Sequence, residues 1–334
     1  MATIGTGVLT LVDWAKRLDP DGSIAVVGEL LAQSNRILDD ALFMEGNLQV
    51  GHRTTVRTGL PSVAWRLLNQ GIAPSKSTTA QVDEQCGNLE AWCEVDKQLA
   101  ELNGNVAAFR LSEARAFIEA MNQEMAQTLF YGNSGVNPEE FLGLSPRYSL
   151  TTAGNGQNVL LAGGAAPSVD FSSIWLVGWG DQSVFGIFPK GSTAGLSHED
   201  LGVETVETTA GIAGNRMRAY RDHWVWRCGI ALRDWRYCCR IANVDISNLV
   251  AGTGADLSEF MIKAIHRIPD LGMCRPVFYM NRSVFEYLDI QRRNDVILGG
   301  GITYQNVDGI LVPTFRGVPV RICDALTEAE ALVA

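Results

Sequence analysis

Residues that could bind phosphate are the first candidates for chemistry in this 334-residue sequence. Lys190, Gly191, Ser192 and Thr193 have the composition of the end of a phosphate-binding loop. That loop needs the order Gly-x4-Gly-Lys-Ser/Thr at the start of a helix, and here the lysine precedes the glycine. We therefore interpret the segment as a turn. Gly299–Gly301 is better interpreted as a flexible loop tip than as a nest of amides for an anion.

The best metal-like group is His223, Cys228, Cys238 and Cys239. Adjacent cysteines rarely bind one ion together, and the sequence contains no Cys-x2-Cys pair. We interpret these thiols as core side chains on alternately buried strands. The sequence has no Gly-x-Ser-x-Gly nucleophile elbow, and its four histidines stand in unrelated contexts. We predict no catalytic, cofactor-binding or metal-binding residues, no cofactor, and a protein that is not an enzyme.

The segment Arg216 to Arg240 is the one basic island, with seven arginines interleaved with tryptophan and tyrosine. Such a strip could stack on bases and bind phosphates. Asp222 and Asp234 interrupt it, and strand alternation would bury several of the aromatic rings. We predict salt bridges to other subunits and packing for this segment. Contact with a packaged genome is the alternative.

The bulk composition limits the classes of function. A net charge of −10 argues against a free-standing nucleic-acid binder, which needs a basic face. Charged residues make up 19% of the chain, below the usual ~25%, which indicates that much of the surface meets other protein. An odd number of cysteines without a signal pattern indicates free thiols in a reducing cytosol. No apolar window is long enough to span a membrane.

The first half of the chain contains elements that need a partner surface. Helical patterns at 8–18 and 23–38 form an arm whose apolar stripes are too small to make a core. Residues 47–82 predict a long two-stranded excursion, which is marginal in water when isolated. The strongest helix is expected at 111–131, with Ser112 as its N-cap and Gly132 as its end.

The second half predicts a sheet followed by an α+β lobe. The strand-rich segments are 174–177, 183–188, 217–227 and 228–241. After them we expect a helix over 257–268, a strand over 277–280, a helix capped by Asn281 and a hairpin over 309–323.

Three passages resemble major capsid proteins of tailed double-stranded-DNA phages of the Hong Kong 97 type. Phe130–Asn133, followed by Glu140–Leu144, resembles the end of that family's spine helix and the phrase after it. Val277–Leu288 resembles its strand-then-helix element, and Phe315–Leu326 its returning strand. A narrower likeness, over Trp179–Ser192 and Trp235–Asn243, is to capsid proteins of short-tailed (podovirus) phages.

The resemblance implies an α+β Hong Kong 97-like capsid fold with four parts. They are an N-terminal arm (1–42), an extended loop (43–96), a peripheral domain (97–250) with the spine helix 111–131 and long strands 174–243, and an axial domain (251–334). In the usual arrangement the axial elements follow the spine helix and the long peripheral strands close the chain. Because the strand-rich block comes first here, we expect a permuted segment order.

The resemblance also implies a function and partners. The chain would self-assemble, as pentamers and hexamers, into the icosahedral head that encloses the phage genome, made in the bacterial host cytoplasm and located in the virion. Expected partners are copies of itself, packaged double-stranded DNA bound without sequence specificity, and possible portal, scaffold and cementing proteins, with no membrane. The alternative within this fold is an encapsulin-like nanocompartment shell. A metabolic enzyme and a tail or baseplate protein are the rivals outside it.

Overall fold

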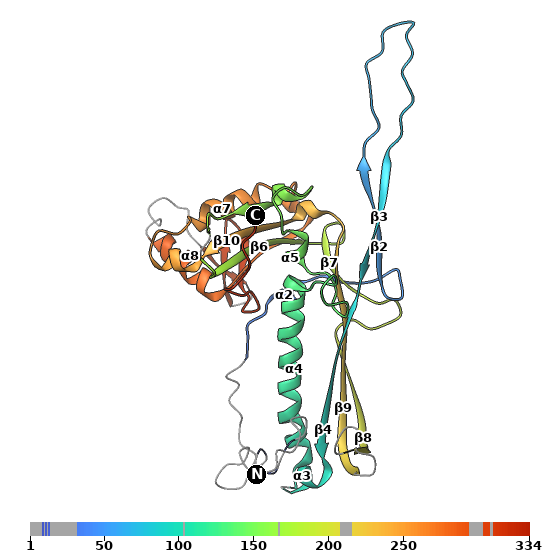
Figure 1. Cartoon of the computed structure of the whole chain (residues 1–334), viewed down its shortest axis with the longest axis vertical. Coiled ribbons are helices and arrows are strands. Elements are labelled where there is room, and N and C mark those ends of the chain that lie inside the picture. Colours follow the sequence, from blue (N-terminus) through green and yellow to red (C-terminus); the bar gives the residue numbers. More distant parts are fainter. Residues whose placement is uncertain are drawn as a thin grey trace.

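The computed structural model describes residues 9, 11, 13, 32–102, 104–165, 168–207, 216–293, 303–307 and 310–334. Figure 1 shows an elongated molecule in which a helical rod and long strands run down from a lobe, while a hairpin projects in the opposite direction.

The rod is helix α4 (Val106–Tyr131), preceded by the short helix α3 (Lys97–Glu101). Its 26 residues at about 1.5 Å each give a length of roughly 39 Å. The predicted N-cap, Ser112, is wrong, because the Asn105 side chain accepts the hydrogen bond from the Ala108 amide and starts the helix five residues before the predicted 111. The Ser112 hydroxyl instead donates to the Phe109 carbonyl within the helix. The predicted end at Gly132 is confirmed.

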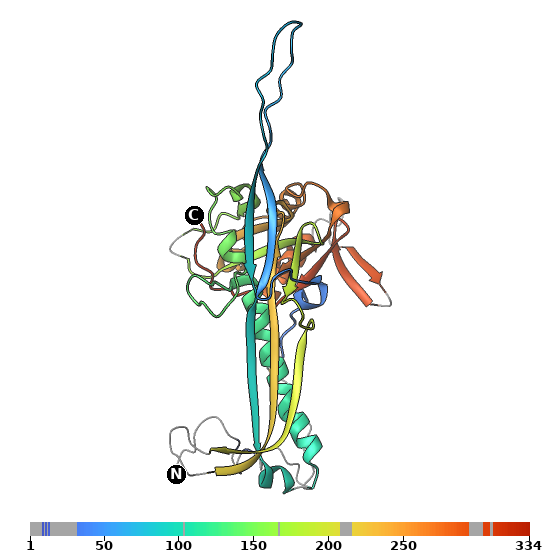
Figure 2. The same cartoon turned by 90° about the vertical axis from the view of Figure 1, so that its right-hand side faces the viewer.

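Three antiparallel strands lie beside α4: β4 (Gly87–Asp96), β9 (Arg216–Leu232) and β8 (Leu196–Glu207). Cys93 and Val95 of β4 pack with Phe109 of α4 in a small core. Figure 2 shows the strands alongside the helix. The predicted break between 227 and 228 is wrong, since β9 continues to Leu232 and the strand changes at the turn η2 (Trp235–Tyr237).

The lobe is built on strands that are buried on both faces. β6 (Phe171–Trp179) pairs antiparallel with β10 (Cys238–Asp245) and β11 (Arg275–Met280), and β11 pairs parallel with β14 (Val318–Ile322). Side chains on one face pack with α7 (Leu257–Ile265) and α8 (Arg282–Arg293). Those on the other face pack with the end of α4 and α5 (Leu144–Arg147). Every residue of β6 is buried, as expected of a strand covered on both sides.

The remaining elements connect these layers. They are α2 (Ile37–Asp40), β1 (Phe43–Glu45), β2 (Gly51–Gly59), β3 (Thr78–Gln85), η1 (Gly156–Asn158), β5 (Val159–Leu161), β7 (Val184–Phe188), α6 (Ile246–Val250), η3 (Leu271–Met273), β12 (Thr303–Val307) and β13 (Ile310–Phe315). β7 pairs with both β6 and β9, so it joins the lobe sheet to the strands beside α4.

The predicted division of the second half is wrong for two strands. β6 and β10 belong to the predicted block 174–243, yet both lie in one sheet with β11 of the last ninety residues. The boundary expected at 250 therefore cuts through a continuous sheet. The apolar residues on both faces of β6 and β10 require a central position, whereas β8 and β9 lie along the helix.

The end of the expected arm belongs to the core. Ile37 is fully buried, and the Asp40 carboxylate accepts a hydrogen bond from the Tyr279 hydroxyl at 3.2 Å. The boundary expected at 42 is therefore too late. Of the helix expected at 8–18, the structure describes residues 9, 11 and 13, and Leu11 and Asp13 are helical. Of the helix expected at 23–38 it describes residues 32–38, where the prediction is wrong up to residue 36, because Asn35 forms a β-bridge with Cys323 and α2 starts only at Ile37.

Candidate functional site

The projecting hairpin is the most exposed part of the described chain. β2 and β3 pair antiparallel from Gly51↔Gln85 to Gly59↔Thr78, which confirms the two-stranded excursion predicted over 47–82. Residues 60–77 form the tip and are exposed almost throughout. Figures 1 and 2 show the tip standing clear of the lobe in both views.

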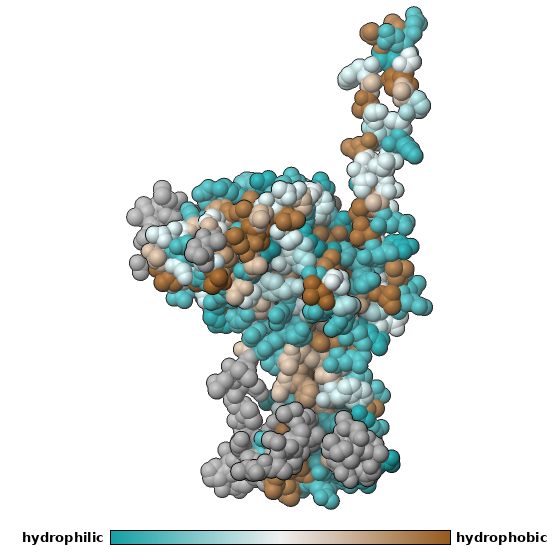
Figure 3. Space-filling view, viewed as in Figure 1, coloured by the Kyte–Doolittle hydropathy of each residue, from teal (hydrophilic) through white to brown (hydrophobic). Residues whose placement is uncertain are grey.

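The tip exposes several large apolar side chains to solvent. Trp65 is 104% exposed, Val63 91% and Leu68 89%, and the others that stand out are Leu60, Leu67 and Ile72. Figure 3 shows brown, hydrophobic residues along the projecting ribbon. So many large apolar side chains exposed on one short segment are typical of a site of interaction with another protein.

The base of the hairpin is held by a nearly buried ion pair. The Arg147 guanidinium donates to both carboxylate oxygens of Glu84, at 2.5 and 2.6 Å, and the two side chains are 12% and 6% exposed. Arg147 also donates to the carbonyl of Leu142 at 2.9 Å and to that of Gly143 at 3.1 Å. This bidentate contact ties β3 to α5 and so sets the direction in which the hairpin leaves the body.

His52 lies at the same base, on β2. Its ring packs edge-on against Phe185 with 5.4 Å between the centroids. Burial and the nearby Arg233 guanidinium lower the pKa of His52, with Glu84 acting weakly in the opposite direction. Protonation of this imidazole therefore opposes the packing at the hairpin base.

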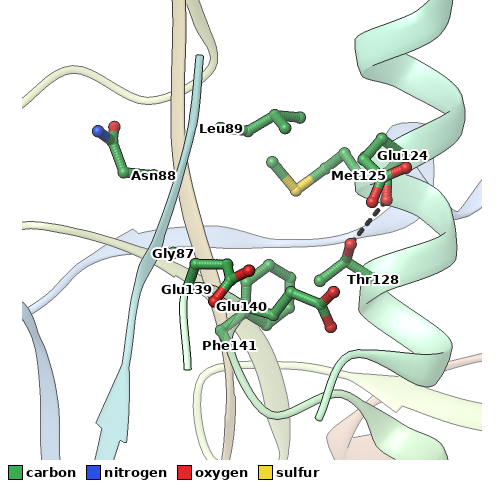
Figure 4. Close-up of a pocket in the computed structure, with 9 residues that line it drawn as sticks. All are labelled: Gly87, Asn88, Leu89, Glu124, Met125, Thr128, Glu139, Glu140 and Phe141. Carbon is green, nitrogen blue, oxygen red and sulfur yellow. Dashed lines mark hydrogen bonds between the residues drawn. The ribbon is translucent and has the colours of Figure 1, made fainter. Parts of the chain in front are cut away.

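A cavity of about 250 Å³ lies between the start of β4, the C-terminal half of α4 and the loop 139–141. Figure 4 shows its lining, with an apolar floor and carboxylates around it. The floor contains Leu89, Met125 and Phe141, and the carboxylates are Glu124, Glu139 and Glu140. The volume is below the ~300–1,000 Å³ of typical small-molecule sites.

The basic island folds differently from the expectation. Arg221 pairs with Glu94 and Glu204, Arg236 with Asp234, and Arg240 with Glu330, all within the chain. These three arginines therefore have acidic partners in their own chain, and salt bridges of this segment to other subunits stay a prediction. The expectation that several aromatic residues of this segment are core residues is confirmed by the buried Trp224 and Tyr237.

The metal-like group does not converge on one point. Cys238 lies in the core on one face of the lobe sheet and Cys239 in the core on the other, which confirms the alternating burial. His223 stacks on Trp92 with 4.0 Å between the ring centroids. Burial raises the pKa of Cys228 and of Cys239 to about 12, so both thiols are protonated at neutral pH.

The remaining motifs are structural. Ser192 donates its amide to the Pro189 carbonyl in a turn with Gly191 at a φ of +81°, which confirms the turn. The Asn281 side chain accepts from the Ser283 amide and caps α8 as predicted. Gly299–Gly301 lies outside the described residues.

Sequence reasoning missed the network around Arg240. This guanidinium donates to Glu330 at 2.8 Å, to Ser173 at 3.0 Å and to the Tyr148 carbonyl at 3.0 Å. The Tyr131 hydroxyl donates to the other Glu330 oxygen at 2.5 Å. Five residues from separate parts of the sequence meet here, so no local spacing could have revealed the site.

Comparison with known proteins decides the family. The profile described as Major capsid protein GP7 matches residues 19–334. The chain belongs to this major capsid protein family. This capsid protein has the α+β, Hong Kong 97-like fold expected from its sequence, and its place is the virion. The family is one of structural proteins.

Several solved structures are similar to this capsid protein. A chain of the cryo-EM structure of bacteriophage Epsilon15 is 32% identical over 100% of both chains, with a TM-score of 0.80. The capsid of the native GTA particle is 9% identical and covers 67% of this chain and 95% of its own, with a TM-score of 0.44. The SrpI encapsulin of Synechococcus elongatus PCC 7942 is 12% identical, covers 71% and 97%, and has the same TM-score of 0.44.

No curated protein matches this sequence. In the part of the chain that the structure describes, no helix is long and apolar enough to cross a membrane.

Proposed function

We propose that this capsid protein closes the icosahedral head, as pentamers and hexamers, by laying its β2–β3 hairpin over a neighbouring copy. The observation that carries the proposal is the tip 60–77, which stands clear of the body and exposes large apolar side chains such as Trp65 and Leu68 (Figures 1 and 2). Because a lone hairpin is marginal in water, a stable position for it requires a second surface.

Assembly supplies such a surface in every copy. Identical chains around five- and six-fold centres meet through heterologous contacts, in which a projecting element of one subunit meets a different surface of the next. Obligate contacts of this kind commonly bury more than about 2,000 Å². A hairpin that is fixed at its base and exposes apolar side chains at its tip can make such a contact with a neighbouring subunit.

The four expected parts are proposed here in a revised form. We assign 1–31 to the arm, 43–86 to the extended loop, and α4 with β4, β8 and β9 to the peripheral domain. The lobe built on β6, β10, β11 and β14 is then the axial domain. The revision follows the sheet pairing, because β4 lies beside α4 while β6 and β10 lie in the lobe.

The enclosed partner in this proposal is double-stranded DNA without sequence-specific contacts, because a net charge of −10 does not favour tight binding of phosphate. A portal, a scaffold and a cementing protein are further partners of the same proposal. A cargo-enclosing nanocompartment shell is the alternative. Nuclease-protected DNA in purified particles supports the phage head, and particles that hold protein cargo without DNA would support the alternative.

Replacing residues 60–77 by Asn-Gly tests the role of the tip. This pair favours a two-residue turn that closes β2 onto β3 after the last pair, Gly59↔Thr78. We expect a nearly unchanged free energy of unfolding, because the tip stands clear of the body (Figures 1 and 2). We also expect no closed shells by electron microscopy. A Gly/Ser loop of the original length is the control for loop length. Normal shells from either variant would contradict the proposal.

A further inference from the structure

The cavity between β4, α4 and the loop 139–141 is chemically suited to a basic and aromatic partner. Its floor is apolar, and the Glu140 carboxylate is already held by the Asn137 side chain at 2.8 Å and by the Asn133 amide at 3.2 Å. The Glu124 and Glu139 carboxylates have no hydrogen bond or ion pair to any described residue. Two negative charges therefore stand unpaired beside an open apolar floor (Figure 4).

The hairpin tip has the complementary composition. Residues 60–77 contain Arg66 and Lys76 and neither aspartate nor glutamate, although the chain as a whole carries a net charge of −10. Trp65 stands next to Arg66 and is fully exposed. Tryptophan beside arginine is a typical anchor of protein interfaces, because the ring fills a pocket while the guanidinium pairs at its edge.

A chain cannot fill this cavity with its own tip. Gly87 lines the cavity and follows β3 after a single residue, so the cavity lies at the root of the hairpin whose far end carries the tip. Strands of nine and eight residues extend about 30 Å, and the Arg147 and Glu84 contact holds their base. The tip points away from the body in both views (Figures 1 and 2). A tip in the cavity must come from a second copy.

We propose that the hairpin tip of one capsid subunit seats Trp65 in this cavity of a neighbouring subunit, with Arg66 and Lys76 paired to Glu124 and Glu139. The inference rests on the proposed function, which gives the hairpin a neighbour but not a receptor. Each copy then carries both a hairpin tip and a receptor cavity, so the same contact can repeat between successive copies around a ring. The cavity lies beside the base of its own subunit's hairpin. A bound tip from one subunit therefore also packs against the hairpin base of the neighbouring subunit.

Cross-linking between two variants tests the contact directly. Ala64→Cys places a thiol next to Trp65, and Thr128→Cys places one on the cavity wall; both changes keep every charge and the apolar floor. Shells assembled from a mixture of the two full-length variants are treated with a mild oxidant. We expect a reducible dimer from the mixture and none from either variant alone or from the natural sequence. Mixed shells without this dimer would overturn the assignment of the receptor.

A charge reversal gives a second, independent readout. We expect Arg66→Glu to lower the yield of closed shells at least tenfold and Glu124→Arg in the same chain to restore it. Glu286→Lys, at an exposed helical glutamate of the lobe, is the matched control. Full assembly of the Arg66→Glu variant, or no restoration by Glu124→Arg, would contradict the pairing. If the tip-shortened chain also assembles normally, the proposed function fails; if only the pairing tests fail, the hairpin has a different receptor.

Discussion

Arg240 and Glu330 form an ion pair that is almost removed from water, with both side chains 3% exposed. Burial and the charge of Glu330 raise the pKa of Tyr131, whose hydroxyl therefore remains a hydrogen-bond donor to this pair. The contact joins β10, β6, α4 and the C-terminal segment. A buried charge that loses its partner is costly, because the low-dielectric interior leaves it uncompensated.

We predict that Arg240→Met lowers the free energy of unfolding by about 3–5 kcal/mol, since Glu330 would remain buried without its cation. Urea unfolding of the unassembled subunit measures this loss. Arg236→Met is the matched control, because Arg236 pairs with Asp234 at a site where 53% of the arginine side chain is exposed. Exposed pairs contribute about 0–1 kcal/mol, and equal losses in both variants would contradict the prediction.

His52 predicts a pH dependence at the hairpin base. Its pKa is lowered from the ordinary value of 6.5 by burial and by Arg233, so the unfolded chain takes up the proton more readily than the folded one. The free energy of unfolding should therefore fall as the pH drops below about 6.5, with no contribution from this residue above it. His52→Gln should remove that part of the slope between pH 7.5 and 5.5, as measured by chemical unfolding. An unchanged slope in the variant would contradict this prediction.

At the scale of elements, the end of α4 depends on two chain segments that cross closely. The Gly143 amide donates to the Gly132 carbonyl at 2.8 Å, and a Cβ on Gly132 would lie 2.5 Å from the Phe141 carbonyl oxygen and 2.6 Å from that of Thr128. Both neighbours are backbone atoms, which cannot move aside cheaply. The crossing brings the loop 139–141 and α5 against the helix and so forms one wall of the cavity.

We predict that Gly132→Ala lowers the free energy of unfolding by about 1–3 kcal/mol, the usual cost of overpacking. Gly135→Ala is the control, because its nearest neighbour would be a side-chain atom, Asn133 Oδ1, at 3.2 Å. Thermal unfolding of both variants provides the comparison. A Gly132 variant as stable as the natural chain would mean that the crossing can relax.

The elements also show which sequence signals were sufficient. The apolar spacing of α4 predicted a long helix, yet its start was misplaced because Ser112 and Asn105 are both good caps and only one can begin the helix. The residues 217–241 predicted strands, but not where one strand ends. β9 pairs first with β4 beside the helix and then with β7 in the lobe, and its sequence shows no break at the point where the partner strand changes.

At the scale of the whole molecule, the position of residues 32–42 changes how the arm can be tested. Ile37 and Asp40 belong to the core, so deletion of residues 1–40 would damage the fold itself. Deletion of residues 1–31 is the appropriate experiment. We predict a subunit that stays folded, with a small fall in the free energy of unfolding because Leu9 packs against the small core of Cys93, Val95 and Phe109. We also predict a loss of closed shells by electron microscopy, because the proposed arm supplies contacts between subunits. Normal shells from this truncated chain would refute a role of the arm in assembly.

Local patterns in the sequence were sufficient for the α+β class, the long helix, the projecting hairpin and the capsid family, because each depends on periodicity or on phrases within a few tens of residues. Only the tertiary structure decided the pairing of β6 and β10 with β11, the buried Arg240 and Glu330 pair, and the Arg147 and Glu84 contact. These join residues 63 to 90 positions apart, or strands whose order in a sheet is not the order in the chain. The shell subunit was thus recognisable from its sequence. The direction in which its hairpin projects and the cavity at the hairpin base instead depend on contacts between distant segments.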